Sequence, residues 1–154
     1  MAERGDALTG LRVVPARAGE RAPCFEIRRR VFIEEQGVAT SEELDGQDDA
    51  CFHWLAFLGA EPVGTARLRA SSEGWKAERV AVLPAARRHG VGEALMRALE
   101  AEAWRRGATE VVLHAQTAVI PFYERLGYTA EGPVFDEAGI PHRLMRIPRS
   151  GRAS

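Results

Sequence analysis

The sequence predicts a protein of the α/β (α+β) class, in which one mixed β-sheet carries helices on both of its faces. Short segments with continuous or alternating apolar residues, typical of strands, recur along the chain. Segments with apolar residues at i, i+3 and i+4, typical of amphipathic helices, lie between them. The expected order is strand, helix, acidic loop, three strands, helix, strand, helix and two strands. Helices distributed among strands in this way cover both faces of a sheet.

Length and composition narrow the class of protein. A chain of 154 residues fits one domain, because most domains contain roughly 100 to 200 residues, so we expect a single domain over residues 1–154. The hydrophobic fraction of 45%, the charged fraction of 28% and the net charge of −1 are those of an ordinary soluble protein and do not favour nucleic acid as a partner. No apolar run approaches the roughly 18 residues that span a bilayer, and the N-terminus lacks the apolar core of a secretion signal. We expect a cytoplasmic protein without a membrane partner.

The two cysteines, Cys24 and Cys51, lie far apart and show no metal-ligand spacing with the four histidines. Buried thiols are therefore expected rather than a disulfide or a zinc site, and no metal is predicted.

The N-terminal part of the chain predicts one strand and one helix. Residues 1–10 have no periodic apolar pattern and are expected to form a loose arm. A short strand is expected over 11–15. Apolar residues at helical spacing then predict a helix over 23–36, ended by Gly37.

The following segment, residues 40–49, contains five carboxylates and almost no apolar side chain, so we expect a loop. Clustered carboxylates set a negative local potential that attracts a cationic substrate. The alternative is a solvated surface loop, which is the commoner use of a charge run. The five are Glu42, Glu43, Asp45, Asp48 and Asp49.

A hairpin and a third strand follow the acidic segment. Apolar runs predict strands over 51–58 and 63–70, and the turn at 71–74 leads into a strand that starts near Trp75 and ends near Leu83.

Glu78 is the polar exception in this third strand. The period of two places it on the same face as Val80 and Val82. A carboxylate on an apolar face is expected to have a raised pKa, because desolvation disfavours its charged form, and is then a candidate base. The alternative is a salt bridge with Arg67 or Arg69 across the sheet.

The second half of the chain predicts two helices and three strands. They are a helix over 91–106 ended by Gly107, a strand over 110–115, a helix over 118–126 ended by Gly127, and strands over 128–135 and 142–147. Glycine suits both helix ends, because it adopts the left-handed backbone conformation readily. The tail from Pro148 is expected to be disordered.

A basic loop, Arg87-Arg88-His89-Gly90-Val91-Gly92, joins the third strand to the helix after it. A helix N-terminus presents unpaired N–H groups and a partial positive charge, so this loop suits an anion, most often a phosphate. The glycines allow a close approach of the backbone, and the arginines add charge. A P-loop would need Gly-Lys-Ser/Thr, and a dinucleotide-binding loop would need a third glycine where Leu95 stands, so both are excluded.

Two blocks of the chain resemble the GNAT acyltransferase superfamily. The basic loop matches its Arg/Gln-x-x-Gly-x-Gly/Ala signature and follows a Val-Ala-Val strand, as in that family. Residues 116–128 resemble its Asn-x-x-Ala-x-x-Phe-Tyr-x-x-x-Gly-Phe/Tyr block, with Gln116 and Val119 in place of the Asn and the Ala.

A third block narrows the resemblance. Arg28-x-x-Val31-Phe32-x-x-Glu35-Gln36-Gly37, together with Gly139-Ile140-Pro141-His142, is similar to the small bacterial ElaA/YjcF-like branch. The resemblance covers about residues 8–147, which we take as the core of the domain, with flexible ends. It implies a mostly antiparallel sheet of six to seven strands.

The resemblance also implies a function. The family consists of acetyl-CoA-dependent N-acetyltransferases that usually act on primary amines, so the expected partners are acetyl-CoA and a small-molecule or peptide amine. The strand backbone would pair with the pantetheine arm, and the N–H groups of the basic loop would hold the pyrophosphate. An exposed edge at the last strands could pair two copies as a homodimer. The residues expected to bind acetyl-CoA are Val80, Ala81, Val82, Arg87, Arg88, His89, Gly90, Val91, Gly92, Gln116 and Phe122.

The expected reaction is direct acetyl transfer in a ternary complex. Tyr123 stands where the family places its general acid, and a phenol of pKa about 10 can donate to a thiolate whose free pKa is about 8.5. The alternative is a core tyrosine with a satisfied hydroxyl group. Glu78 is the leading base, with Glu35 and His142 as reserves that would otherwise contact the acceptor, and a base acting through water also stays open. His142 could equally face solvent on an edge strand.

Two other classes of function fit the same residues. A non-catalytic acyl-CoA-binding module or sensor would keep the phosphate-binding loop but lack a working acid and base. A structural interaction domain would bind no acetyl-CoA at all.

Overall fold

A computed structural model describes residues 4–6 and 10–149, with no side chains described for 4–6. Its strands form one sheet in the order β1-β2-β3-β4-β5-β6-β8-β7. All neighbouring pairs are antiparallel except β5 with β6, which confirms the mixed, mostly antiparallel sheet. The strands are β1 Arg4–Asp6, β2 Leu11–Ala16, β3 Phe52–Leu58, β4 Glu61–Ser71, β5 Gly74–Val82, β6 Glu110–Gln116, β7 Thr129–Glu137 and β8 Ile140–Pro148.

The two ends of the chain differ from the expectation where they are described. Arg4–Asp6 lies in the expected loose arm, yet it pairs with β2 and makes the sheet eight-stranded. A ladder of backbone hydrogen bonds needs no apolar period, so the sequence pattern gave no sign of it. Pro148 still belongs to β8 rather than to a disordered tail. The rest of the expected loose ends, residues 1–3, 7–9 and 150–154, lies outside the described residues.

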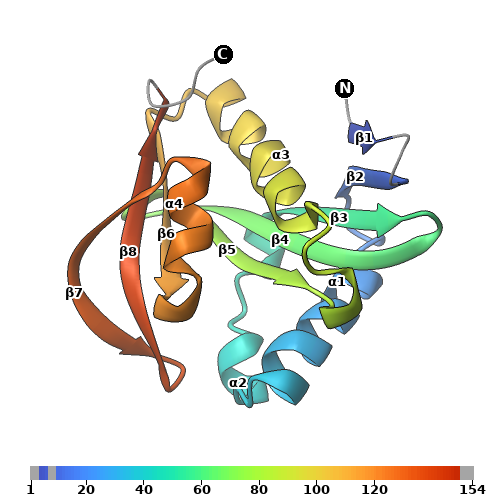
Figure 1. The fold of residues 1–154 in the computed structure, drawn as a ribbon, viewed down its shortest axis with the longest axis horizontal. Coiled ribbons are helices and arrows are strands. Elements are labelled where there is room, and N and C mark those ends of the chain that lie inside the picture. The colour runs from blue at the N-terminus through green and yellow to red at the C-terminus, as the bar shows by residue number, and fades with distance from the viewer. Residues whose placement is uncertain (1–3, 7–9, 150–154) are drawn as a thin grey trace.

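Helices cover both faces of the sheet, as predicted (Figure 1). α3 and α4 pack on one face, and α1 with the π-helical turn η1 packs on the other. Among the described residues, no helix is both long and apolar enough to cross a membrane. The helical elements are α1 Ala22–Arg28, η1 Arg29–Glu35, α2 Thr40–Glu43, η2 Asp48–Ala50, η3 Pro84–Ala86, α3 Val91–Arg105, η4 Thr117–Val119 and α4 Ile120–Leu126.

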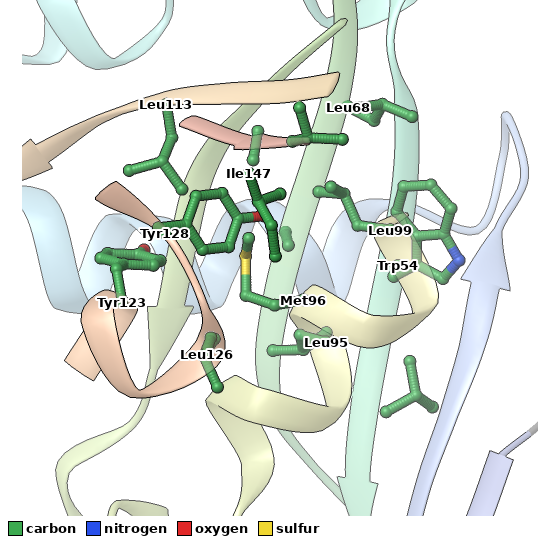
Figure 2. Close-up of a cluster of buried hydrophobic side chains, with 14 of the residues drawn as sticks. Trp54, Leu68, Leu95, Met96, Leu99, Leu113, Tyr123, Leu126, Tyr128 and Ile147 are labelled. Carbon is green, nitrogen blue, oxygen red and sulfur yellow. The ribbon is translucent and has the colours of Figure 1, made fainter. Parts of the chain in front are cut away.

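The main core lies between the sheet and α3 (Figure 2). Leu95, Met96 and Leu99 project from α3 and are fully buried. α4 adds Tyr123 and Leu126, which close the core beside them. The first residues of α3 are therefore held in place by packing, and they are the residues that border the basic loop.

β5 contains a bulge that changes which face its side chains occupy. Thr65 pairs with Ala81 and Arg67 pairs with Glu78, so two residues of β5 lie opposite one residue of β4. Arg79, one of these two residues, has a positive φ of 56°. Ala77 packs under α3, whereas Ala81 packs against α1 on the opposite face.

The bulge corrects one expectation. Val80 and Val82 pack against the α3 core, whereas the Glu78 carboxylate is bonded to arginine side chains. The prediction that Glu78 shares a face with these valines is wrong, because strict alternation holds only for an unbroken strand.

Replacing Leu99 by Ala should lower the free energy of unfolding by about 2–5 kcal/mol, because the side chain is fully buried and its removal leaves a cavity under α3. Urea denaturation measures this change. The control is Leu44→Ala, at a side chain that is 52% exposed, where we expect a change within about 0.5 kcal/mol. Equal effects at both sites would contradict this account of the core.

Candidate active site

The site is a cavity that opens where β5 and β6 separate. The two strands pair only over Trp75–Ala77 and Val111–Leu113, and then they diverge (Figure 1). The cavity beyond this point has a volume of about 1060 Å³. The predicted site residues that line it are Glu78, Val80, Ala81, Val82, Arg87, Arg88, Gly90, Val91, Gly92, Gln116, Phe122, Tyr123 and His142. Of the predicted set, Glu35 and His89 do not line it.

One end of the cavity is formed by the basic loop and the first turn of α3. Gly90 precedes the helix with a left-handed φ of 79°. The first hydrogen bond of the helix runs from the Ala94 N–H group to the Gly90 carbonyl, so helix geometry leaves the N–H groups before Ala94 without helical partners. A Cβ atom built on Gly92 would lie 3.1 Å from the Phe122 ring, which shows how closely α4 approaches this turn. The arrangement suits a phosphate group.

Arg87 has two partners that the sequence did not reveal. Its guanidinium donates to both carboxylate oxygens of Glu35, at 2.8 and 2.6 Å, and its Nε donates to the Val82 carbonyl at 2.9 Å. The hydrogen bond from Arg87 lowers the pKa of Glu35. Glu35 is therefore an ion-pair partner of the basic loop, and its predicted roles as acceptor contact or reserve base stay predictions. His89 is exposed at the tip of the loop.

Glu78 is held by cations on several sides. Arg69 donates to both of its oxygens at 2.8 and 2.9 Å, Arg67 donates at 2.9 Å, and the Lys76 Nζ atom lies at 3.3 Å. Burial disfavours the charged carboxylate, but the hydrogen bond from Arg69 and the charges of Arg67 and Lys76 outweigh it and lower the pKa of Glu78 to about 2. The expected raised pKa is wrong, and the alternative of a salt bridge is confirmed. A carboxylate of this kind is too weak a base for an alkylammonium group, so the role of leading base is corrected.

The acidic segment 40–49 is tied to the sheet. Glu43 and Asp48 accept hydrogen bonds from Arg28, and Asp45 accepts one from Arg67 at 2.6 Å. Both arginines are almost fully buried. Three of the five carboxylates are thus paired with buried arginines, and of these three only Glu43 is itself buried. Composition alone could not reveal this, because the buried arginines come from distant elements.

Tyr123 lies on α4 with its side chain at the cavity. Its ring is 8% exposed and packs edge-on against Phe122 and Tyr128. Within the described part of the chain its hydroxyl has no hydrogen-bond partner, and burial alone raises the pKa of Tyr123. Tyr128 contrasts with Tyr123. Its hydroxyl donates to Glu100 at 2.6 Å, and the residue does not line the cavity. The alternative of a core tyrosine with a satisfied hydroxyl therefore describes Tyr128 rather than Tyr123.

His142 and Gln116 lie opposite each other on β8 and β6. The Gln116 amide donates to Gln36 Oε1 at 2.8 Å, which links β6 to the end of η1. His142 is 6% exposed and lies on a strand with partners on both sides, so the solvent-facing alternative on an edge strand is wrong.

Further polar residues that were not predicted as site residues line the cavity, among them Lys76, His114 and Glu137. The alternation of β6 could have indicated His114, because it shares a face with Gln116. Glu137 comes at the end of β7, where no pattern marks it.

Comparisons with known proteins agree with this geometry. A family model described as an acetyltransferase (GNAT) domain matches residues 20–148. The uncharacterized N-acetyltransferase YjcF of Bacillus subtilis is 40% identical over 122 residues, which cover 79% of this chain and 87% of that protein. The structure of an acyl-CoA N-acyltransferase from Pseudomonas aeruginosa gives a TM-score of 0.76 at 30% identity, over 89% of this chain and 99% of that one. The crystal structure of Escherichia coli ElaA gives a TM-score of 0.74 at 27% identity, over 88% of this chain and 97% of that one.

This chain therefore belongs to the GNAT acetyltransferase family, in its ElaA/YjcF-like branch, and is an acyltransferase. The family and branch predicted from the sequence motifs are confirmed.

Acid should destabilise this protein partly through Glu78. Its pKa of about 2 in the folded state lies below the ordinary 4.5, so its contribution is fully present above about pH 4.5 and is lost as the pH falls toward 2. The contribution is about 3 kcal/mol at neutral pH. Urea unfolding of the wild type between about pH 6 and about pH 3 should show this loss. The Glu78→Gln variant should have a lower free energy of unfolding at neutral pH, and this free energy should decrease less steeply as the pH falls. If the free energies of unfolding of the two proteins changed with pH in parallel, this role of the carboxylate would be ruled out.

Proposed function

We propose that this protein is an acetyl-CoA-dependent N-acetyltransferase that moves an acetyl group to a primary amine of a small molecule or a peptide in a ternary complex. The observation that carries the proposal is one cavity that is lined both by the start of α3, which suits a phosphate, and by Tyr123, whose hydroxyl has no partner among the described residues. The relatives named as N-acetyltransferase and acyl-CoA N-acyltransferase support the class of donor.

The donor would lie along β5. After Ala77 this strand has no described neighbour on the β6 side, so its backbone N–H and carbonyl groups there are available to an extended ligand with amide groups. The pantetheine arm of acetyl-CoA is such a ligand. Its pyrophosphate would reach the first turn of α3, where Arg88 and Gly92 line the cavity and the helix dipole favours an anion.

The chemistry needs a proton donor for the leaving thiolate and a donor for the oxyanion. Tyr123 is protonated at neutral pH, which is the form that can donate to a thiolate. A backbone N–H group of β5 near Val82 would bind the oxyanion of the tetrahedral intermediate. Neither Cys24 nor Cys51 lines the cavity, which favours direct transfer over a covalent intermediate on a thiol. The cytoplasm, where acetyl-CoA is available, is the compartment that goes with this proposal.

Tyr123→Phe should lower kcat by about 10²- to 10⁴-fold while the affinity for acetyl-CoA stays the same, because only the transferable proton is removed. CoA release is measured with a panel of polyamines, aminosugars, amino acids and peptide N-termini. The matched control is Tyr128→Phe, which removes a phenol outside the cavity and should lower stability but not kcat. An unchanged kcat in Tyr123→Phe would favour a binding module or a different general acid.

Gly92→Val should weaken acetyl-CoA binding, because the new side chain would occupy space at the Phe122 ring and cover the N–H groups of the helix start. Acetyl-CoA at about 100 times its Kd should stabilise the wild type by about 2.7 kcal/mol, seen as a rise in Tm. We expect little or no rise in the variant, with the unliganded Tm of each protein as the reference. A wild-type Tm that acetyl-CoA does not change would favour a structural interaction domain.

A further inference from the structure

A cluster of titratable side chains lies on the cavity wall away from the basic loop. It consists of His142 on β8, His114 on β6, Glu137 at the end of β7 and Glu73 in the turn between β4 and β5. Three of the four, His114, Glu137 and His142, line the cavity. Together they have the residue types of a proton-transfer site.

One contact fixes the tautomer of the neutral His142 ring. Its Nδ1 atom lies 2.7 Å from the Ile140 carbonyl oxygen. A carbonyl can only accept a hydrogen bond, so Nδ1 carries the hydrogen, and in the neutral ring the lone pair is on Nε2. No described group is within hydrogen-bond distance of that Nε2 atom, and the nearest anion is Glu137 Oε2 at 3.9 Å. His142 thus presents an open proton acceptor at the cavity.

The charged groups around His142 fit this role. The other oxygen of Glu137 binds His114 Nδ1 at 2.8 Å, and Glu73 binds His114 Nε2 at 3.1 Å. Lys76 lies 3.5 Å from Glu73. The hydrogen bond from His114 lowers the pKa of Glu137, so a carboxylate anion lies beside His142 at neutral pH.

The other candidate bases are engaged in ion pairs. Glu78 is held by Arg67, Arg69 and Lys76. Glu35 is paired with Arg87 and does not itself line the cavity. His114 has a carboxylate on each ring nitrogen, and the hydrogen bond with Glu137 raises the pKa of His114. Of the two histidines that line the cavity within the described part of the chain, His142 is therefore the one with a free ring nitrogen.

We propose that His142 is the general base of the acyl transfer: its Nε2 atom takes a proton from the ammonium group of the acceptor, and Glu137 stabilises the imidazolium that forms. The proposal rests on the proposed function and adds the base that the reaction requires. His142 would contact the acceptor amine directly, and Glu137 is a positioning residue that acts through it.

Protons and bonds balance in this scheme. His142 takes one proton from R–NH₃⁺, and the free amine then forms a C–N bond to the thioester carbonyl. The C–S bond breaks, Tyr123 gives its proton to the CoA thiolate, and the amide nitrogen loses its second proton, which restores Tyr123. The imidazolium releases its proton to solvent, so one amide, one CoA thiol and one proton are formed.

The test is the pH profile of kcat/KM for His142→Asn, with an amine from the acceptor screen. Asn keeps an N–H group for the Ile140 carbonyl but has no proton acceptor in place of Nε2. We expect kcat/KM near neutral pH to fall about 10²- to 10⁴-fold. The wild type should reach a plateau near neutral pH, whereas the variant should keep rising about tenfold per pH unit toward the pKa of about 10 of an alkylamine. A merely structural role would not change the shape of this profile.

Two comparisons sharpen the result. Arg143→Gln alters the next residue of β8, whose side chain donates to Gly132 outside the cavity lining, and should leave the profile unchanged. Glu137→Gln should move the start of the plateau to lower pH, because the imidazolium loses its neighbouring anion.

The outcomes separate the two proposals. A wild type that acylates an amine, with a His142→Asn variant of the same rate and profile, would overturn the assignment of His142 alone. A wild type whose Tm rises with acetyl-CoA but which acylates no amine in the panel would overturn the proposed function and the base together. If the plateau in kcat/KM is lost in His142→Asn but kept in the wild type and in Arg143→Gln, the result supports both the proposed function and the assignment of His142.

Discussion

The separation of β5 from β6 is the constraint on which the site depends. Each strand is paired on its other side, β5 with β4 except at the bulge and β6 with β8, so the divergence costs only the bonds between the two separating strands. Unpaired backbone groups inside a fold are costly unless a ligand or water satisfies them. The gap therefore leaves backbone groups of β5 after Ala77 without described partners on the β6 side, which is the basis for the proposed position of the donor. The bulge at Arg79 turns Val80 and Val82 toward the α3 core.

A buried ionic network ties α1 and the acidic segment to the sheet. Arg28 and Arg67 are almost fully buried, and they hold the acidic segment against β4 and β5. Burying such charges costs several kcal/mol per ion, which pairing offsets, so the network contributes a defined geometry more than net stability. It also supports the positive φ of Arg79, whose guanidinium bonds to Glu43 and Asp45. The consequence is that Glu78 is a structural anion, held by Arg67, Arg69 and Lys76.

Much of the fold could be predicted because its elements carry local signals. Helical spacing marked α3, glycines marked its end and that of α4, and the basic loop followed its strand as expected. The site was predicted less evenly. Most of the loop, Phe122 and Tyr123 line the cavity, whereas Glu35 and Glu78 have arginine partners that the sequence pattern did not indicate for Glu35 and gave only as an alternative for Glu78. His114 and Glu137 were missed, because they meet only when β6, β7 and β8 lie side by side.

The sequence by itself determined the class of sheet, the family and the phosphate-type loop, since these depend on periodicity and on residues close together in the chain. Only the tertiary structure decided which titratable groups are free. An ion pair such as Arg87 with Glu35 joins residues far apart in sequence, and the tautomer of the neutral His142 ring depends on one carbonyl contact. The physical reason is that proton affinity depends on burial and on charges within a few ångströms, and both are properties of the folded chain.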